Sequence, residues 1–220
     1  MNETDPTELA SLMCSRLCHD LLSPVGALSN GLELLADETD PEMRQRCIDL
    51  LEQSARISTD KLKFFRLAFG AAGGFGEQVP IDEPQALVMA LVGDNGRITV
   101  NWAIGANALP KPVVKILLNF AQISIESLVR GGTLDIGVEA NGDTCEIAVR
   151  AAGPKVAFDD IIGRALEGRL ADGELSSRTA AAHMISLLTT EHDGQIQYAL
   201  DNEALVLGAV LPALTPDLVG

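Results

Sequence analysis

Residues 9–37 read LASLMCSRLCHDLLSPVGALSNGLELLAD, and this stretch decides the fold of the N-terminal part of the chain. Its apolar side chains return every three or four positions, which is the spacing of one face of an α-helix. They are Leu9, Leu12, Met13, Leu17, Leu21, Val25, Leu28, Leu32 and Leu35. Asp5 and Thr7 are both suitable caps for its start, and Glu8 favours the first turn. The stretch predicts one long helix that ends in the polar run 36–40.

A second long helix is predicted directly after that run. Asp40-Pro41-Glu42 supplies an N-cap, a proline at the first helical position and an acidic first turn. Apolar residues then recur at helical spacing until Gly70, which ends the helix. Because the loop between the helices is short, they are expected to be antiparallel neighbours. One hairpin is too thin to bury its apolar stripe, so we expect a homodimer that forms a four-helix bundle. The alternative is that the stripe packs only on the rest of the chain.

The segment GAAGGFG, residues 70–76, has four glycines in seven residues and predicts a boundary between two domains. Residues 1–72 are then the helical hairpin, and residues 77–220 form a second domain. Helices are expected there over 83–92, 111–129 and 176–190, and strands over 98–104, 133–140, 144–150, 195–200 and 204–211. Asn141-Gly142 predicts a type I′ turn between two of these strands. The alternation indicates an α/β sandwich, a mixed sheet with helices on one face, and an α+β chain overall.

Composition excludes several functions. The net charge is −15, from 31 acidic and 16 basic residues, so the surface repels nucleic acid and anionic lipid. Aromatic residues are only 4% of the chain, which disfavours stacking on bases or sugars. The spacing of the cysteines, at 14, 18, 47 and 145, predicts neither a disulfide framework nor a zinc site. We find no signal-peptide pattern and no run long enough to span a membrane, and therefore expect a cytoplasmic protein without membrane insertion.

His19 is the candidate reactive residue. Helical rotation places it nearly opposite Leu17, Leu21, Val25 and Leu28, on the polar side of the first helix. An exposed imidazole is largely neutral at cytosolic pH, so one ring nitrogen keeps a free lone pair and accepts a phosphoryl group well.

Two neighbours of His19 bear on its chemistry. Asp20 is placed to orient the ring or to take its proton; the alternative is an ordinary solvated carboxylate. Pro24 removes the helix hydrogen bond to the carbonyl of Asp20 and predicts a bend one turn beyond His19.

The helix face around His19 is the candidate docking surface for a partner. Leu22 is apolar on a polar face, and Gly26 allows close backbone approach. The predicted docking residues are Arg16, Leu22, Ser23, Gly26 and Asn30. On the second helix, residues near Ile57 are expected to lie level with His19.

The run HDLLSP, residues 19–24, resembles the H-box of histidine kinases: histidine, an acidic residue, an aliphatic residue, two variable positions and proline. In that family this histidine is the phosphorylated residue on the first helix of a dimerisation hairpin. The motif is short, but a helical hairpin and an α/β sandwich follow here in the family's order.

The second domain resembles a histidine-kinase ATP-binding domain that has lost its nucleotide-binding residues. The resemblance places Ile123 where the family has its magnesium-binding asparagine, and Ala151 where an aspartate recognises adenine. Lys155 replaces a glycine, and Ser176-Ser177-Arg178-Thr179 has no glycine where the family has its phosphate loop. It therefore implies a chain that does not bind ATP. His183 and His192 are interpreted as structural, one on a packed helix and one at a helix end.

Nearly the whole chain, from about residue 8 to 213, resembles the ChpT-type histidine phosphotransferases. The resemblance implies a phosphorelay intermediate in cell-cycle regulation. His19 would exchange a phosphoryl group with the receiver domain of a CckA-like hybrid kinase and with CtrA-like and CpdR-like response regulators. It implies no cofactor or metal in this chain, with magnesium supplied by the receiver. The alternative is a non-catalytic pseudokinase scaffold that binds receivers.

Overall fold

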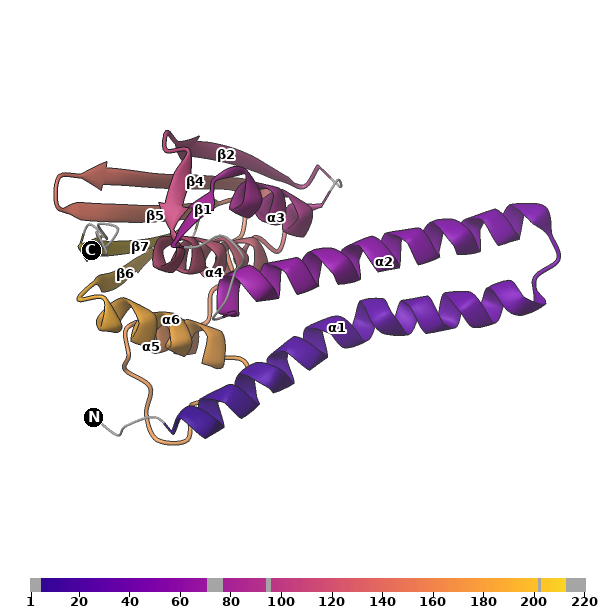
Figure 1. Ribbon diagram of the computed structural model, residues 1–220, viewed down its shortest axis with the longest axis horizontal. Coiled ribbons are helices and arrows are strands. Elements are labelled where there is room, and N and C mark those ends of the chain that lie inside the picture. The colour runs from indigo at the N-terminus through magenta and orange to yellow at the C-terminus, as the bar shows by residue number, and fades with distance from the viewer. Residues whose placement is uncertain (1–4, 71–76, 94–95, 202, 213–220) are drawn as a thin grey trace, which may run out of the picture.

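The computed structural model describes residues 5–70, 77–93, 96–201 and 203–212, and its N-terminal part is a helical hairpin (Figure 1). α1 (Pro6–Asp37) and α2 (Pro41–Phe69) lie side by side. The carboxylate of Asp5 accepts a hydrogen bond from the amide of Thr7, so Asp5 is the cap of α1. The carboxylate of Asp40 caps α2 in the same way, at 3.0 Å from the amide of Met43. Residues 71–76 of the predicted boundary segment lie outside the described residues.

The C-terminal part is built on a five-stranded sheet with the order β2-β4-β5-β7-β6. β2 is parallel to β4, and the other neighbouring pairs are antiparallel, so the sheet is mixed as expected. The strands are β2 (Ile98–Ile104), β4 (Gly132–Asn141), β5 (Thr144–Ala152), β6 (Gln195–Leu200) and β7 (Ala204–Pro212). A separate two-stranded sheet joins β1 (Gln78–Pro80) to β3 (Ala108–Pro110).

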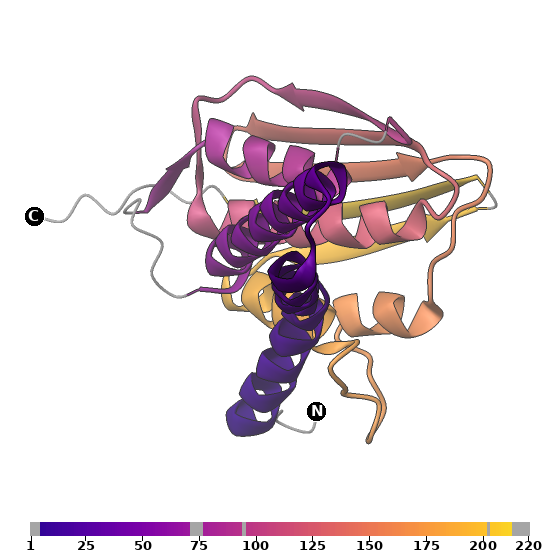
Figure 2. The same ribbon diagram turned by 90° about the vertical axis from the view of Figure 1, so that its right-hand side faces the viewer.

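Helices cover one face of the five-stranded sheet (Figure 2). They are α3 (Asp82–Val92), α4 (Lys111–Ser127), α5 (Asp160–Leu166) and α6 (Ala180–Glu191). α4 is the central one, and Ile116, Leu117 and Phe120 on it are fully buried. Alternate strand residues such as Ile147 and Val149 meet them from the sheet. This confirms the predicted α+β chain of helical hairpin and sandwich.

The hairpin is attached to the sandwich by one end only. Phe64, Phe65 and Ala68, near the end of α2, belong to the same hydrophobic core as the sheet. Met13 of α1 packs with Ala180 and Ala181 at the start of α6. The other half of the hairpin, with the loop that joins its helices, projects away from the sandwich (Figure 1).

Several local expectations are corrected. The hairpin between β4 and β5 forms, and its two loop residues are Gly142 and Asp143. Only Gly142 has a positive φ, 61°, which is the pattern of a type II′ turn, whereas the predicted type I′ turn requires a positive φ at both. α4 ends at Ser127, two residues before the predicted end. α6 begins at Ala180 and not at Ser176, because the hydroxyl of Thr179 takes part in a turn, accepting from the amide of Ser176 and donating to the carbonyl of Glu174.

The apolar stripe predicted on α1 is only partly covered in the single chain. Leu17 and Leu21 pack against the main core, whereas the Val25 side chain is 47% exposed. The buried positions of α1 are Met13, Pro24 and Gly31. Periodicity locates an apolar face but not the partner that covers it, so part of this face is left open.

Within the described ranges, no helix combines the length and the apolar character that crossing a membrane requires.

Candidate functional site

His19 lies midway along α1 and projects into solvent. Its side chain is 87% exposed. Nδ1 of His19 is 3.3 Å from Oδ1 of Asp20, whose own side chain is only 25% exposed. When Nδ1 carries the ring proton, this contact is a hydrogen bond to the carboxylate, and the lone pair of Nε2 faces outward. The arrangement presents a nucleophilic nitrogen to an incoming partner.

Pro24 is accommodated in α1 by a lysine from α2. Because Pro24 has no amide hydrogen, the carbonyl of Asp20 has no intrahelical partner. The ammonium of Lys61 donates a hydrogen bond to that carbonyl at 2.8 Å. α1 remains helical throughout and changes direction near its middle (Figure 1). The structure thus places Lys61 beside Asp20, one turn further along α2 than the predicted Ile57.

The proposed docking residues are distributed over the exposed side of α1. Leu22 is 68% exposed, and Ser23 and Asn30 are also exposed. A Cβ atom added to Gly26 would meet nothing within 4 Å. Arg16 differs from these four, because its side chain is 16% exposed and turns toward the C-terminal domain.

The two other histidines lie elsewhere. His183 is buried on α6, and desolvation lowers the pKa of its imidazole. His192 is the C-cap residue of α6, where the sequence predicted a helix end.

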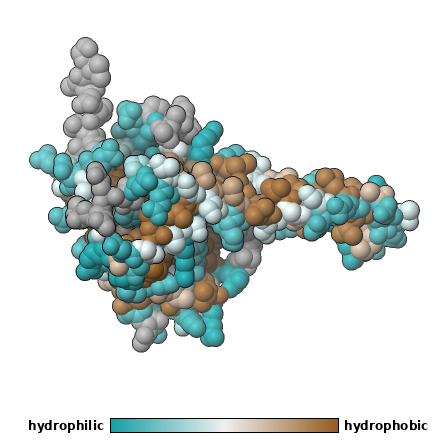
Figure 3. Space-filling model, turned by 90° about the horizontal axis from the view of Figure 1, so that it is seen from below, coloured by the Kyte–Doolittle hydropathy of each residue, from teal (hydrophilic) through white to brown (hydrophobic). Residues whose placement is uncertain are grey.

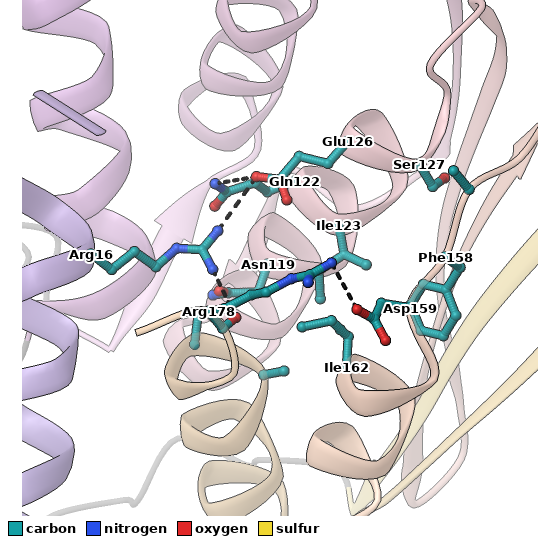
Figure 4. Close-up of a pocket in the computed structure, with 13 residues that line it drawn as sticks. Arg16, Asn119, Gln122, Ile123, Glu126, Ser127, Phe158, Asp159, Ile162 and Arg178 are labelled. Carbon is teal, nitrogen blue, oxygen red and sulfur yellow. Dashed lines mark hydrogen bonds and ion pairs between the residues drawn. The ribbon is translucent and has the colours of Figure 1, made fainter. Parts of the chain in front are cut away.

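A cavity of about 320 Å³ lies between α1, α4, α5 and the start of α6 (Figure 4). Ile123, which the resemblance places at the position of the kinase asparagine, lines it. Ala151, which the resemblance places at the position of the kinase aspartate, is fully buried in β5 and presents no polar side-chain atom. Lys155 is exposed. The residues present therefore do not fit the recognition of adenine or of a nucleotide-bound magnesium ion.

Ion pairs occupy the polar part of this cavity. Arg178 pairs with Asp159 at 2.8 Å, and Arg16 reaches Glu126 at 3.4 Å. Figure 4 shows both pairs, with Arg16 entering from α1. The cationic groups that line the cavity are thus already paired with carboxylates.

Comparisons with known proteins identify the family of this chain. A family model described as the histidine phosphotransferase C-terminal domain matches residues 81–204. The chain is 30% identical over 202 residues to the protein phosphotransferase ChpT of Brucella abortus (strain 2308), covering 92% of this chain and 95% of that protein. This chain belongs to the histidine phosphotransferase family.

A solved structure is also similar to this chain. It is described as a bacterial phosphotransferase and is 28% identical, with a TM-score of 0.81 over 94% of this chain and 98% of that chain. This chain therefore shares the helical hairpin and the sheet domain with that protein over nearly the full length of both chains.

The structure also reveals site residues that the sequence did not indicate. Lys61 and Glu126 contact Asp20 and Arg16 from distant parts of the phosphotransferase chain. Only the local pair His19–Asp20 and the proline after it carry a signal that sequence reasoning recognises.

Proposed function

We propose that this protein is a phosphorelay intermediate that accepts a phosphoryl group on His19 from an aspartyl phosphate and returns it to another aspartate. The observation that carries the proposal is the exposed His19 imidazole with its Nδ1 held by Asp20, within a helical hairpin and a run that resembles the H-box. The membership of the histidine phosphotransferase family supports it.

The reaction needs little from this chain beyond a positioned imidazole. Nε2 of His19 attacks the phosphorus, the N–P bond forms, and the P–O bond to the aspartate breaks. The bonding electron pair leaves with the aspartate carboxylate. Such transition states are loose and depend on positioning and charge neutralisation. We assign the magnesium ion and a lysine to the receiver that supplies the aspartate, and the orientation of the imidazole to Asp20.

The receiver docks, in this proposal, on the α1 face that surrounds His19. Leu22 is an exposed apolar anchor next to the histidine, and Gly26 leaves room for a close approach. Ser23 and Asn30 extend this surface with polar groups. The partners we propose are receiver domains of a CckA-like hybrid kinase and of CtrA-like and CpdR-like regulators, in the cytoplasm.

A second copy of the chain covers the remaining apolar face of the hairpin in this proposal. Val25 and Leu32 on α1, and Met43, Leu50 and Ile57 on α2, are exposed in the single chain. Within each helix they recur every seven residues, a spacing typical of helices that pack side by side. Figure 3 shows hydrophobic side chains along the projecting hairpin. On α1 this face lies about 120° from His19 at 3.6 residues per turn, so pairing leaves the imidazole accessible.

Phosphorylation of the intact protein tests the proposal. A purified receiver domain carrying aspartyl phosphate is mixed with the wild-type protein, and mass spectrometry locates the modified residue. We expect one phosphoryl group on His19. The variant His19→Ala should take none and keep its thermal stability, because the side chain is 87% exposed. His192→Ala is the matched control and should still be phosphorylated.

The outcomes distinguish this function from a scaffold. Binding of the receiver without transfer to any histidine would indicate a non-catalytic scaffold. Modification of His183 or His192 would show that His19 is not the acceptor.

A further inference from the structure

Arg16 connects the phosphotransfer helix to the C-terminal domain. Its Nε atom is 3.8 Å from Oδ2 of Asp20, one helical turn further along α1. Its Nη2 atom is 3.4 Å from Oε1 of Glu126, and its Nη1 atom donates a hydrogen bond to the carbonyl of Arg178 at 3.3 Å (Figure 4). One guanidinium therefore contacts α1, the last turn of α4 and the turn before α6.

The C-terminal domain fixes where this guanidinium lies. Glu126 accepts a second hydrogen bond from the side-chain amide of Gln122 at 3.0 Å, which holds its carboxylate in place. The Arg178 group is a backbone carbonyl, and it lies two residues before the start of α6. Because the Arg16 and Asp20 side chains are only 16% and 25% exposed, solvent screens their ion pair less than it screens a surface ion pair.

Asp20 divides its two oxygen atoms between Arg16 and His19. Oδ2 faces the guanidinium, and Oδ1 faces Nδ1 of the imidazole. At 3.8 Å the contact is an ion pair and not a hydrogen bond, and its attraction favours orientations of the carboxylate that keep Oδ2 toward the guanidinium and Oδ1 toward Nδ1. With that proton on Nδ1, the lone pair used for attack is on Nε2.

We propose that Arg16 is a positioning residue for phosphoryl transfer, which holds Asp20 so that Asp20 keeps the His19 imidazole in the tautomer with Nε2 open. This role rests on the function proposed above. It also assigns a function to the contact between the two domains. α4 and the turn before α6 set the position of the Arg16 side chain, and Arg16 in turn affects the orientation of His19 through Asp20. When the N–P bond forms, both ring nitrogens are substituted and the ring gains positive charge, which the carboxylate of Asp20 then stabilises.

Two measurements on the full chain test the role of Arg16. The first is the rate of phosphoryl transfer from a receiver that carries aspartyl phosphate. The second is ¹⁵N NMR of the histidine side chains, which distinguishes the two neutral tautomers without any transfer. Arg16→Ala should slow transfer by about tenfold to about a hundredfold, as small misplacements of reacting groups do. Its His19 spectrum should shift from the Nδ1–H tautomer toward the Nε2–H tautomer.

Companion variants make the test specific. Arg16→Lys keeps the charge but lacks the planar fork that reaches three groups, so its rate should lie between those of Arg16→Ala and the wild type. Arg150→Ala is the matched control. Arg150 pairs with Asp135 at 3.1 Å on the sheet, and its loss should change neither the rate nor the tautomer. Glu126→Gln removes the negative charge that pairs with the Arg16 guanidinium in the C-terminal domain, and it should slow transfer several-fold.

The results separate this inference from the proposed function. A wild-type protein that is not phosphorylated on His19 overturns the proposed function, and the role of Arg16 with it. A wild type that is phosphorylated normally, with an unchanged rate and tautomer in Arg16→Ala, overturns the role of Arg16 alone. Should Arg16→Ala not fold, Glu126→Gln decides, because the Glu126 side chain is 58% exposed, and an unchanged rate in it overturns the inference.

Discussion

At the scale of single residues, burial gives two histidines of this chain opposite properties. The side chain of His19 is 87% exposed and meets a carboxylate. His183 retains only 9% of its accessible surface, on the inner face of α6, and the loss of hydration lowers the pKa of its imidazole. The buried ring therefore takes up a proton less readily than an exposed imidazole does.

We predict that His183 makes the protein less stable as the pH falls. An imidazole in the unfolded chain takes up a proton near pH ~6.5, whereas the buried imidazole takes it up only at lower pH. The unfolded state therefore binds more protons in this window, and stability decreases from about pH 6.5 down to the lowered native pKa of His183. Denaturant unfolding between about pH 8 and about pH 5 measures this slope. His183→Gln should flatten it and His192→Gln should not; equal slopes in all three proteins contradict the prediction.

Single residues also show what the sequence can and cannot predict. His19, Asp20 and Pro24 lie within one short run, so the chemistry they suggest is readable from their order. The partners of Arg16 in the C-terminal domain are 110 and 162 residues away, and no local pattern marks them. For the same reason Arg16 was predicted as a docking residue from its helix face alone, whereas its side chain turns toward Glu126.

At the scale of elements, local signals predicted the long helices well and the short elements poorly. The Asp-Pro starts of α1 and α2 are supported by cap hydrogen bonds that involve only neighbouring residues. The seven residues of α5 and the three-residue strands β1 and β3 were not predicted. Elements this short have no periodicity of their own, and tertiary packing holds them.

Two glycines of α1 should respond oppositely to substitution. A Cβ at Gly31 would lie 2.9 Å from Cδ2 of Leu51, whereas a Cβ at Gly26 meets nothing within 4 Å. Gly26→Ala should therefore raise the free energy of unfolding by about 0.5–1 kcal/mol through helix propensity. Gly31→Val should lower it by about 1–3 kcal/mol, because the Leu51 side chain must leave its present rotamer or α1 and α2 must move apart. Denaturant titrations of the two variants provide the comparison, and a stabilising Gly31→Val would show that the helices adjust freely.

The docking face on α1 can be tested without disturbing the core. Leu22→Glu and Gly26→Gln should weaken receiver binding and slow transfer, because one removes an apolar anchor and the other fills the approach to the backbone. Neither substitution should lower the melting temperature, since Leu22 is 68% exposed and Gly26 is open. Leu187→Glu, on α6 at 43% exposure, is a control with a similar change in charge. Normal exchange by both α1 variants would place the docking face elsewhere, for example on the C-terminal domain.

At the scale of the whole molecule, one end of the hairpin packs on the sandwich, whose lack of nucleotide binding remains a prediction from the resemblance to kinases. The resemblance places Ile123 and Ala151 where the kinases have their asparagine and adenine-binding aspartate, and Arg178 and Asp159 form an ion pair within the cavity beside α4. We therefore predict no binding of ATP, with or without magnesium. Titration calorimetry at micromolar nucleotide should show no heat of binding. A saturable, magnesium-dependent signal would mean that other residues of the cavity recognise the nucleotide.

The exposed apolar series on the hairpin predicts that the protein assembles as a dimer. If the stripe packed only on the sandwich, Met43 and Leu50 would be covered in the single chain, yet they are 43% and 40% exposed on the half of the hairpin that projects away. A two-fold axis along the hairpin would bury this series against its own copy, so that one added charge appears twice in the interface. Leu50→Glu should therefore convert the protein from dimer to monomer in light scattering coupled to size-exclusion chromatography. Leu62→Glu is the matched control: Leu62 is 55% exposed on the same helix but outside the seven-residue series, and its variant should remain dimeric. A dimer that survives both substitutions would require an interface other than this series, and a monomeric wild type would show that the hairpin tolerates the exposed series alone.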